Sequence, residues 1–514
     1  MPRFSLVQSA AVLGIEAYIV KVESHLTSAQ LPRFITVGLP EGAVKESKER
    51  VWSAIKNSGY PFPRLKIVVN LAPADIRKEG SSFDLPMAIG ILSADGHVHR
   101  TKLDDYIILG ELSLDGGLRP IQGALPISVS VRSSGIRGLI LPAENASEAA
   151  ITGGLEVIGV RSLNEAVDFL NDAKAIEPAR VDRHKLFEQH RHYELNFADV
   201  KGQEHVKRAL EVAAAGGHNI IMIGPPGSGK TMLAKRFPSI LPNLTLDEAL
   251  ETTKIHSVAG LIPAGQGIVA TRPFRAPHHT ISDAALVGGG KYPRPGEVSL
   301  SHHGVLFLDE LPEFKKNVLE VMRQPMENGT VTISRAQMSL TYPASFLLVA
   351  AMNPCPCGFA TDPNNACSCT PMQIQKYMSR ISGPLLDRID IHIEVPAVKY
   401  ADLASKTAGE PSEIIRARVQ QAREIQLQRF AGLPGIYANA HMHSKLIRRF
   451  CAIDASGEAL LRTAISKLGL SARAYDRILK VGRTIADLAG TTEIRPEYIG
   501  EAIQYRSLDR HFWL

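Results

Sequence analysis

The sequence has few cysteines and no long apolar run. Only five of its 514 residues are cysteine, and four of these lie between Cys355 and Cys369. Thiols this sparse and clustered are unlike the disulfide framework of a secreted protein. No run of about 18 apolar residues occurs, as a membrane-spanning helix would need, and polar residues interrupt the amino-terminal apolar segment. We therefore expect a cytoplasmic protein without a membrane partner.

The remaining composition is that of a soluble globular protein. Hydrophobic residues make up 45% of the chain, which is enough for buried cores, and the length predicts about three domains. The formal net charge is +6, and the basic excess falls after the first 171 residues. A phosphate-backbone partner would favour such an excess, but an ordinary solvated surface accounts for it equally well.

Changes in the apolar pattern divide the chain. Residues 1–171 and 195–396 alternate short apolar runs with helical patterns, which predicts two α/β domains, the second with a parallel sheet. The polar stretch 172–194 contains Pro178 and is typical of a linker or an exposed helix. Residues 397–514 lack strand-like runs, which predicts a helical domain.

The stretch IIMIGPPGSGKT has the pattern of a phosphate-binding loop between a strand and a helix. Its glycines would let backbone N–H groups surround the phosphates of ATP. Lys230 would reach the β- and γ-phosphates, and the Thr231 hydroxyl could bind Mg²⁺. The predicted loop comprises Gly224, Pro225, Pro226, Gly227, Ser228, Gly229, Lys230 and Thr231.

Two later apolar runs end in polar residues suited to ATP hydrolysis. GVLFLDE ends in Asp309 and Glu310, and SFLLVAAMN ends in Asn353. Asp309 is placed to hold the Mg²⁺ shell, Glu310 to polarise the attacking water and Asn353 to orient that water. The alternative is that these residues are two capping acids and a turn amide. The phosphate loop favours the catalytic interpretation.

The order of motifs along the chain resembles that of AAA+ ATPases of the magnesium-chelatase and replicative-helicase clade. These motifs are the phosphate loop, LFLDE, AMNP, PLLDRIDIH and LSARAYDRILKVGRTIADLAG. More narrowly, the chain resembles the ComM family, also called YifB, in the motifs RPFRAPHHTIS, LVGGGKYPRPGEVSLSHHGVLFLDEL and NPCPCG. This resemblance spans essentially the whole chain. This resemblance implies a hexameric ring with ATP sites between subunits. Arg388 matches the arginine finger of the neighbouring subunit, and Arg473 matches the sensor-2 arginine. The alternative for Arg473 is an arginine on a helix surface.

Within residues 1–171, KEGSSFDLPMAIGIL and LGELSLDGGLRPIQGALPISV resemble the proteolytic domain of Lon peptidases, which uses a Ser–Lys dyad. Ser82 matches the nucleophile, but the position of the lysine reads Leu125, and a leucine cannot take a proton. We expect a Lon-like scaffold that helps the ring assemble or guides a substrate.

Two segments are candidates for facing a central pore. The resemblance places residues 279–298 as the helix-2 insert and residues 329–342, which alternate like a hairpin, as the presensor-1 hairpin; both grip DNA in related helicases. Protein-unfolding rings usually offer an aromatic pore loop, whereas these segments offer cations and hydroxyls that suit phosphates. The alternative is a solvated loop and an ordinary hairpin. The candidate DNA contacts are Lys291, Arg294, Arg335 and Gln337.

The clustered cysteines form two C-x-C claws on a loop that can fold back. Four thiolates suit a structural, tetrahedral Zn²⁺ ion, and two disulfides or four free thiols are the alternatives. We hypothesise that the metal braces the loop between Asn353 and the helix leading to Arg388, and so rigidifies the ATP-sensing interface between subunits. The candidate ligands are Cys355, Cys357, Cys367 and Cys369.

The neighbouring pairs His278–His279 and His302–His303 are weaker metal candidates. Neighbours on an extended strand point to opposite faces, so we expect structural histidines at these positions instead.

These interpretations predict an α/β protein with an N-terminal Lon-like domain, a central AAA+ ATPase domain and a C-terminal helical lid. The ComM resemblance implies an ATP-driven hexameric branch-migration helicase that acts on single-stranded and branched DNA during natural transformation, with recombination proteins as possible partners. One alternative is a metal-chelatase motor subunit, whose resemblance covers only the ATPase and helical parts. An ATP-dependent protease and a regulatory ring that remodels a protein partner are further alternatives.

Overall fold

The computed structural model of the chain describes all residues except 1–2, 41, 75–77, 79, 190–191, 264–266, 291–292, 336–337, 363–364, 399–408, 434 and 509–514. Among the described residues, we find no helix with the length and apolar character needed to cross a membrane. The chain forms two compact units. The first unit comprises residues 1–191 and 246–270, and the second comprises residues 192–245 and 271–514.

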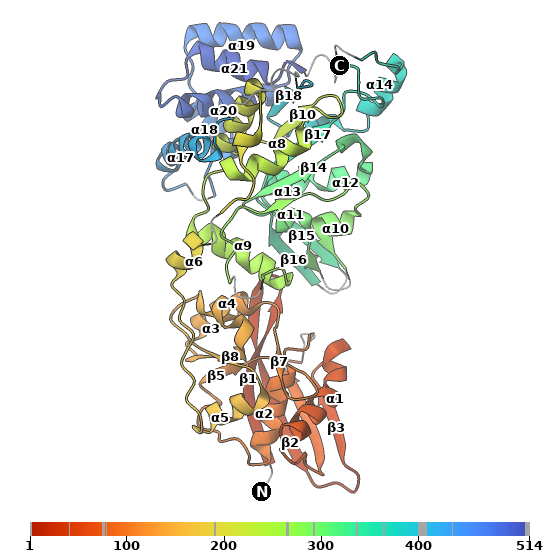
Figure 1. Cartoon of the computed structure of the whole chain (residues 1–514), viewed down its shortest axis with the longest axis vertical. Coiled ribbons are helices and arrows are strands. Elements are labelled where there is room, and N and C mark those ends of the chain that lie inside the picture. The colour runs from red at the N-terminus through yellow and green to blue at the C-terminus, as the bar shows by residue number, and fades with distance from the viewer. Residues whose placement is uncertain are drawn as a thin grey trace. The chain divides into compact units, whose positions relative to one another are not determined.

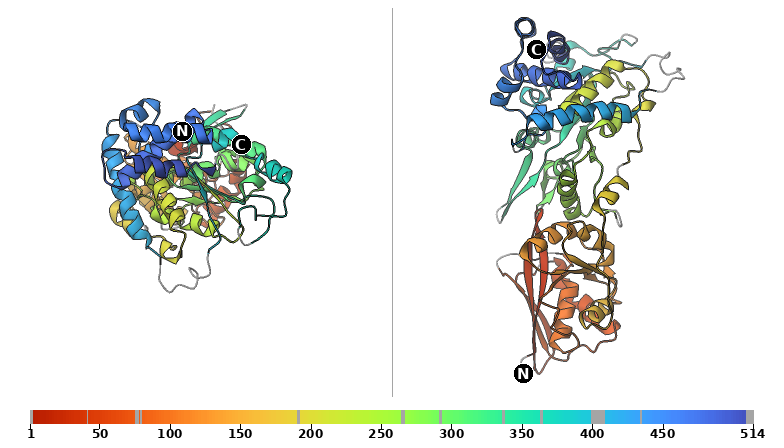
Figure 2. Two further views of the ribbon diagram at one scale, coloured as in Figure 1. Left: turned by 90° about the horizontal axis from the view of Figure 1, so that it is seen from above. Right: turned by 90° about the vertical axis from the view of Figure 1, so that its left-hand side faces the viewer.

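The first unit is built on a mixed seven-stranded sheet with the order β3-β4-β2-β1-β5-β8-β9. Its longest strands, β1 and β2, form an antiparallel hairpin that is paired from Arg3 to Leu13, and they lie side by side in perpendicular views (Figures 1 and 2). The strands are β1 (Arg3–Leu13), β2 (Glu16–Thr27), β3 (Arg33–Val37), β4 (Lys66–Ala72), β5 (Tyr106–Ile108), β8 (Gly138–Pro142) and β9 (Glu156–Val160), with a short pair β6 (Glu111–Leu112) and β7 (Leu118–Arg119) beside them.

Helices complete the core of the first unit. Every residue of α2 is buried, which is expected for an apolar helix that packs against the sheet on one side and other helices on the other. The helices are α1 (Gly42–Asn57), α2 (Asp84–Ala94), α3 (Ala124–Ser134), α4 (Ala146–Ala150), α5 (Leu163–Leu170) and α6 (Arg183–Gln189).

The first unit also contains a helix from much later in the sequence, α9 (Leu246–Val258). The Gly123 backbone N–H donates to the carbonyl of Ser257 at 3.2 Å, and the Ser257 hydroxyl donates to the buried carboxylate of Glu148. Sequence patterns assigned α9 to the 195–396 range because a helical period does not reveal the core against which a helix packs.

The second unit contains a parallel five-stranded sheet with the order β11-β14-β17-β10-β18. All residues of β10, β14 and β17 are buried, as expected for strands covered on both faces. The strands are β10 (Ile220–Ile223), β11 (Phe274–Arg275), β14 (Val305–Leu308), β17 (Leu347–Met352) and β18 (Ile391–Glu394). The helices around them are α7 (Glu204–Gly216), α8 (Lys230–Arg236), α12 (Lys316–Val321), α13 (Arg323–Asn328), α14 (Pro371–Met378) and α15 (Gly383–Leu386).

The carboxyl-terminal part is helical, as predicted, and shares a core with the sheet (Figure 1). Its centre holds a buried ionic network in which Asp487 accepts from Arg429, Arg483 and Asn439. The helices are α17 (Ser412–Arg429), α18 (Ser444–Phe450), α19 (Ala455–Leu468), α20 (Ala472–Leu488) and α21 (Pro496–Gln504).

The two segments predicted to contact DNA pack against each other. The hairpin of β15 (Thr330–Arg335) and β16 (Met338–Pro343) confirms the strand alternation read from the sequence. The insert before β14 forms α10 (Asp283–Val287), the short pair β12 (Gly288–Gly289) and β13 (Arg294–Pro295), and α11 (Glu297–Leu300). The Tyr342 hydroxyl donates to the carbonyl of Pro293 at 2.7 Å, which joins hairpin and insert.

Candidate nucleotide-binding site

The phosphate loop follows the carboxyl end of β10 and leads into α8. Gly227 and Gly229 adopt φ values of 76° and 90°, in the left-handed region where a side chain is disfavoured. Gly229 is the residue before the first turn of α8, so the free N–H groups of that turn face the loop. A helix start of this kind favours a bound anion.

Lys230 is held inside the loop. Its Nζ atom lies 2.8 Å from the carbonyl oxygens of Gly224 and Pro225, and the residue is only 8% exposed. Burial disfavours the charged amine and lowers the pKa of Lys230 to about 8, although the nearby Asp309 carboxylate opposes the shift. The negative charge of a bound phosphate would stabilise the protonated form of Lys230.

Three more predicted residues meet Lys230 at this edge of the sheet. Asn353 follows β17, and its Oδ1 atom lies 3.3 Å from the Lys230 Nζ atom. Asp309 follows β14, and its Oδ2 atom accepts a 2.7 Å hydrogen bond from the Thr231 hydroxyl. Because β10, β14 and β17 are parallel neighbours, their carboxyl ends converge. The Thr231 hydroxyl and the Asp309 carboxylate are oxygen ligands of the kind that Mg²⁺ prefers, so the pair fits a magnesium ion.

Glu310 has a partner that the sequence did not reveal. Its backbone is left-handed, with φ of 53°, and its Oε2 atom lies 3.3 Å from Nδ1 of His279. His279 belongs to the loop after β11, so only the fold brings the two together. The side chain of Glu310 is 57% exposed, which leaves it open to water.

The prediction that neighbouring histidines diverge was wrong. The ring centroids of His278 and His279 lie 4.1 Å apart, and those of His302 and His303 lie 3.8 Å apart. Both pairs occupy loops and turns, where the alternation of an extended strand does not apply.

The two predicted arginines lie at the opposite edge of the sheet. Asn219 directly precedes β10, and its amide donates to the carbonyl of Arg388 at 3.1 Å. Arg388 is therefore beside the amino end of β10, whereas the phosphate loop follows the carboxyl end. Arg473, in the first turn of α20, lies 3.6 Å from Asp387 and lines the same cavity as Arg388. Arg388 also pairs with Glu327 of α13, a partner that no local sequence signal indicates.

A buried network fixes the chain beside Arg388. Asp390 is 3% exposed and accepts from His218 and Arg477, and α20 is thereby tied to the start of β18. Burial alone would raise the pKa of Asp390, but the charge of Arg477 and the hydrogen bond from His218 outweigh it and hold the pKa well below its usual range.

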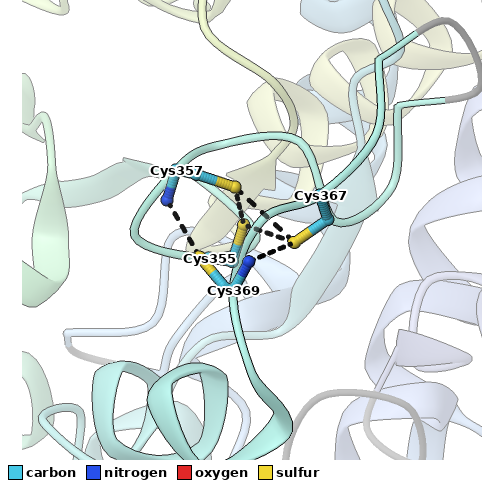
Figure 3. Close-up of side chains that lie close together, drawn as sticks. All are labelled: Cys355, Cys357, Cys367 and Cys369. Carbon is cyan, nitrogen blue, oxygen red and sulfur yellow. Dashed lines mark hydrogen bonds between the residues drawn. The ribbon is translucent and has the colours of Figure 1, made fainter.

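The four clustered cysteines converge on a loop between β17 and α14 (Figure 3). Their Sγ atoms all lie within 4.8 Å of one another, and the Cys355 and Cys367 sulfurs are 3.7 Å apart. A disulfide needs about 2.05 Å, and all four thiols are free. The Phe359 backbone N–H donates to Cys357 and lowers the pKa of its thiol, whereas burial and the neighbouring thiols raise the pKa of Cys369. The cluster fits a tetrathiolate metal site.

The remaining predicted residues are placed as follows. Arg294 is exposed on β13, and Arg335 belongs to β15, whereas Lys291 and Gln337 lie outside the described residues. In the first unit, Leu125 is fully buried in α3, and its backbone N–H donates to Glu148 at 3.0 Å. Ser82 is half-buried in the turn before α2.

Comparison with known proteins gives consistent results along the whole chain. The family described as "Magnesium chelatase, subunit ChlI" matches residues 196–403, "Subunit ChlI of Mg-chelatase" matches residues 22–145, and "Magnesium chelatase, subunit ChlI C-terminal" matches residues 409–506. The chain is 44% identical to "Competence protein ComM" of Haemophilus influenzae, over 98% of both sequences. It is also 44% identical to "Uncharacterized protein YifB" of Escherichia coli, over 98% of this chain and 97% of that protein. "Lon protease 2" of Bacillus subtilis is 27% identical over 36% of each sequence.

Proposed function

Because the chain belongs to the ComM/YifB family of magnesium-chelatase-like AAA+ proteins, we propose that it is an ATP-driven motor that remodels branched DNA. The name of its ComM relative connects that protein with competence. We extend the connection to this chain as a branch-migration helicase that acts on recombination intermediates during natural transformation. Recombination proteins would be its partners, and the cytoplasm its place of action.

The proposed chemistry is hydrolysis of ATP with Mg²⁺. Lys230 neutralises the β- and γ-phosphates, while Thr231 and Asp309 hold the metal. Glu310 polarises the attacking water, and Asn353 orients it. The convergence of these five residues at one edge of the sheet supports the roles. The cofactors of the proposed enzyme are ATP, Mg²⁺ and a structural zinc ion at the four cysteines.

The observation that carries the proposal is the separation of the arginines from the phosphate loop. Arg388 and Arg473 lie at the amino end of the strands, and Lys230 lies at the carboxyl end of the same strands. The arginines therefore cannot complete the site of their own subunit, but a neighbour in a ring can present them. We propose a homo-hexamer in which both arginines act on the adjacent subunit's ATP.

The packing of the insert against the β15–β16 hairpin supports DNA as the substrate. A β-carbon at Gly288 of the insert would lie 2.6 Å from Cδ1 of Ile333, so the two segments touch closely. Together with the Tyr342–Pro293 hydrogen bond, this contact makes them one surface that carries exposed Arg294. In the proposed ring, Lys291, Arg294, Arg335 and Gln337 contact the DNA backbone.

The test measures the ATPase rate of the full chain with no DNA and with single-stranded, branched and duplex DNA. We expect branched or single-stranded DNA to stimulate the ATPase rate. Lys230→Ala and Arg388→Ala should each abolish ATPase activity, with or without DNA. Arg462→Ala, which removes an exposed arginine of α19, is the matched control and keeps the wild-type rate.

Mixing the two inactive variants tests the shared site directly. In mixed rings, about a quarter of the interfaces pair an intact Lys230 with an intact Arg388, so activity returns in part. No recovery on mixing would contradict sites shared between subunits. A rate indifferent to every DNA would favour the alternative, a chelatase-type motor subunit that remodels a protein partner.

A further inference from the structure

The cysteine loop touches the phosphate loop. Gly358, in the middle of the cysteine loop, has φ of +88°, and a β-carbon there would lie 2.6 Å from Cδ of Pro226. Pro226 is a member of the phosphate loop, so the two loops are in direct contact. A glycine is required because any side chain would occupy the space of the proline ring.

A second connection runs through Asn353, which begins the cysteine loop. Its side-chain oxygen lies 3.3 Å from the Lys230 Nζ atom, and its backbone N–H lies near the hydroxyl of Tyr377. Tyr377 is buried in α14, the helix that follows the last cysteine. Thr370 starts that helix with a capping box directly after Cys369. The loop is therefore anchored at both ends beside the nucleotide site.

The middle of the loop has little of its own to hold its shape. The described residues between 354 and 369 form no helix or strand, and Cys367 is exposed. A short segment without a hydrophobic core usually needs a metal or a disulfide to stay folded.

The sulfur positions suit a tetrahedral zinc ion. A zinc–sulfur bond of about 2.3 Å places the corners of a tetrahedron about 3.8 Å apart. The sulfur of Cys355 lies 3.3 Å from that of Cys357 and 3.7 Å from that of Cys367, and the Cys357 and Cys367 sulfurs are 3.5 Å apart. The Cys357 backbone N–H also donates to the Cys369 sulfur at 3.4 Å, a contact that suits a metal-bound thiolate.

We propose that zinc at the four cysteines braces the phosphate loop through the contact of Gly358 with Pro226, so that nucleotide affinity depends on the metal. The sequence suggested that the metal braces the chain between Asn353 and Arg388. The contact of Gly358 with Pro226 indicates instead that the segment braced by the metal is the phosphate loop. The inference rests on the proposed function only for the identity of the nucleotide.

The experiment compares zinc content and nucleotide affinity in the purified full chain. Zinc per chain is measured by mass spectrometry of the metal, and affinity by fluorescence titration with a labelled ADP in Mg²⁺. Cys367→Ser removes one ligand at the exposed side of the cluster, and Cys451→Ser is its control because Cys451 is buried away from the cluster in the core of the second unit.

A glycine pair separates the brace from the metal. Gly358→Ala presses on Pro226 and replaces none of the four ligands. Gly432→Ala is the matched control, because Gly432 has a similar φ of +82° but nothing within 4 Å of an added β-carbon. Both glycines have a positive φ that disfavours alanine to a similar degree, so a difference between the two variants reports the contact with Pro226.

We expect one zinc per chain in the wild type and in Cys451→Ser, and loss of zinc with at least about tenfold weaker binding of labelled ADP in Cys367→Ser. Gly358→Ala keeps its zinc and binds ADP at least about tenfold more weakly, while Gly432→Ala matches the wild type. A wild-type protein without zinc refutes the metal site. Unchanged ADP affinity in Gly358→Ala refutes the brace. DNA takes no part in these measurements, so a failed DNA stimulation would leave both results standing.

Discussion

The burial of Lys230 predicts an unusual pH dependence of nucleotide binding. The Lys230 amine has a pKa of about 8 in the free protein, against 10.5 for an ordinary lysine. Only the protonated amine attracts phosphates, and bound phosphates stabilise its charge. Raising the pH through 8 therefore deprotonates the Lys230 amine of the free protein. Above this pH, nucleotide binding must be accompanied by uptake of one proton from solution.

The size of the effect follows from the pKa. The fraction of free protein with a charged Lys230 falls from about three quarters at about pH 7.5 to about a tenth at about pH 9, so ADP affinity should weaken about eightfold. The terminal phosphate is fully ionised over this range, since its second pKa is about 6. An ordinary lysine would leave the affinity nearly constant.

Titration with labelled ADP at constant ionic strength measures this change. Lys230→Arg is the control, because a guanidinium keeps its proton throughout the range and its affinity, whatever its absolute value, stays level. An equally level profile for the wild type would refute the assignment of a buried, weakly basic lysine to the phosphate loop.

Three further outcomes are expected. His279→Ala should lower the kcat of ATP hydrolysis about tenfold with little change in KM, since His279 orients Glu310 rather than ATP; equal changes in both constants would argue against that role. Asp487→Ala should lower the free energy of unfolding, measured with urea, by about 3–5 kcal/mol, because it leaves Arg429 and Arg483 in the core without their carboxylate. The affinity for branched DNA should fall linearly with salt on logarithmic axes, and a salt-independent affinity would exclude backbone contacts.

The sequence was most informative for residues whose place in the fold follows from the strand or helix next to them in the chain. A strand followed by a glycine-rich loop and a helix predicts the phosphate loop, and apolar runs that end in Asp309 and Asn353 predict where parallel strands end. Because such ends meet at one edge, the convergence on Lys230 could be anticipated from the pattern. The α/β class and the helical carboxyl-terminal part are confirmed for the same reason.

Contacts between distant segments could not be predicted in this way. The pairs Arg388–Glu327 and His279–Glu310 join residues on different elements, and neither member has a local pattern that specifies the other. Gly358 in particular resembles any turn glycine until its contact with Pro226 is seen. Such contacts depend on how the elements pack. A single sequence shows which residues are apolar, but not which distant residues pack against one another.

The placement of α9 in the first unit affects how this protein can be divided experimentally. The chain passes between the units three times, at residues 191–192, 245–246 and 270–271. A truncation that starts at residue 192 would keep α9 but remove Gly123 and Glu148, which bond to Ser257. Such a fragment would expose the buried face of a helix and invite aggregation or proteolysis. The amino-terminal unit therefore cannot be treated as a detachable module, and a loss of activity on its removal would report damage to the remainder as readily as a lost function.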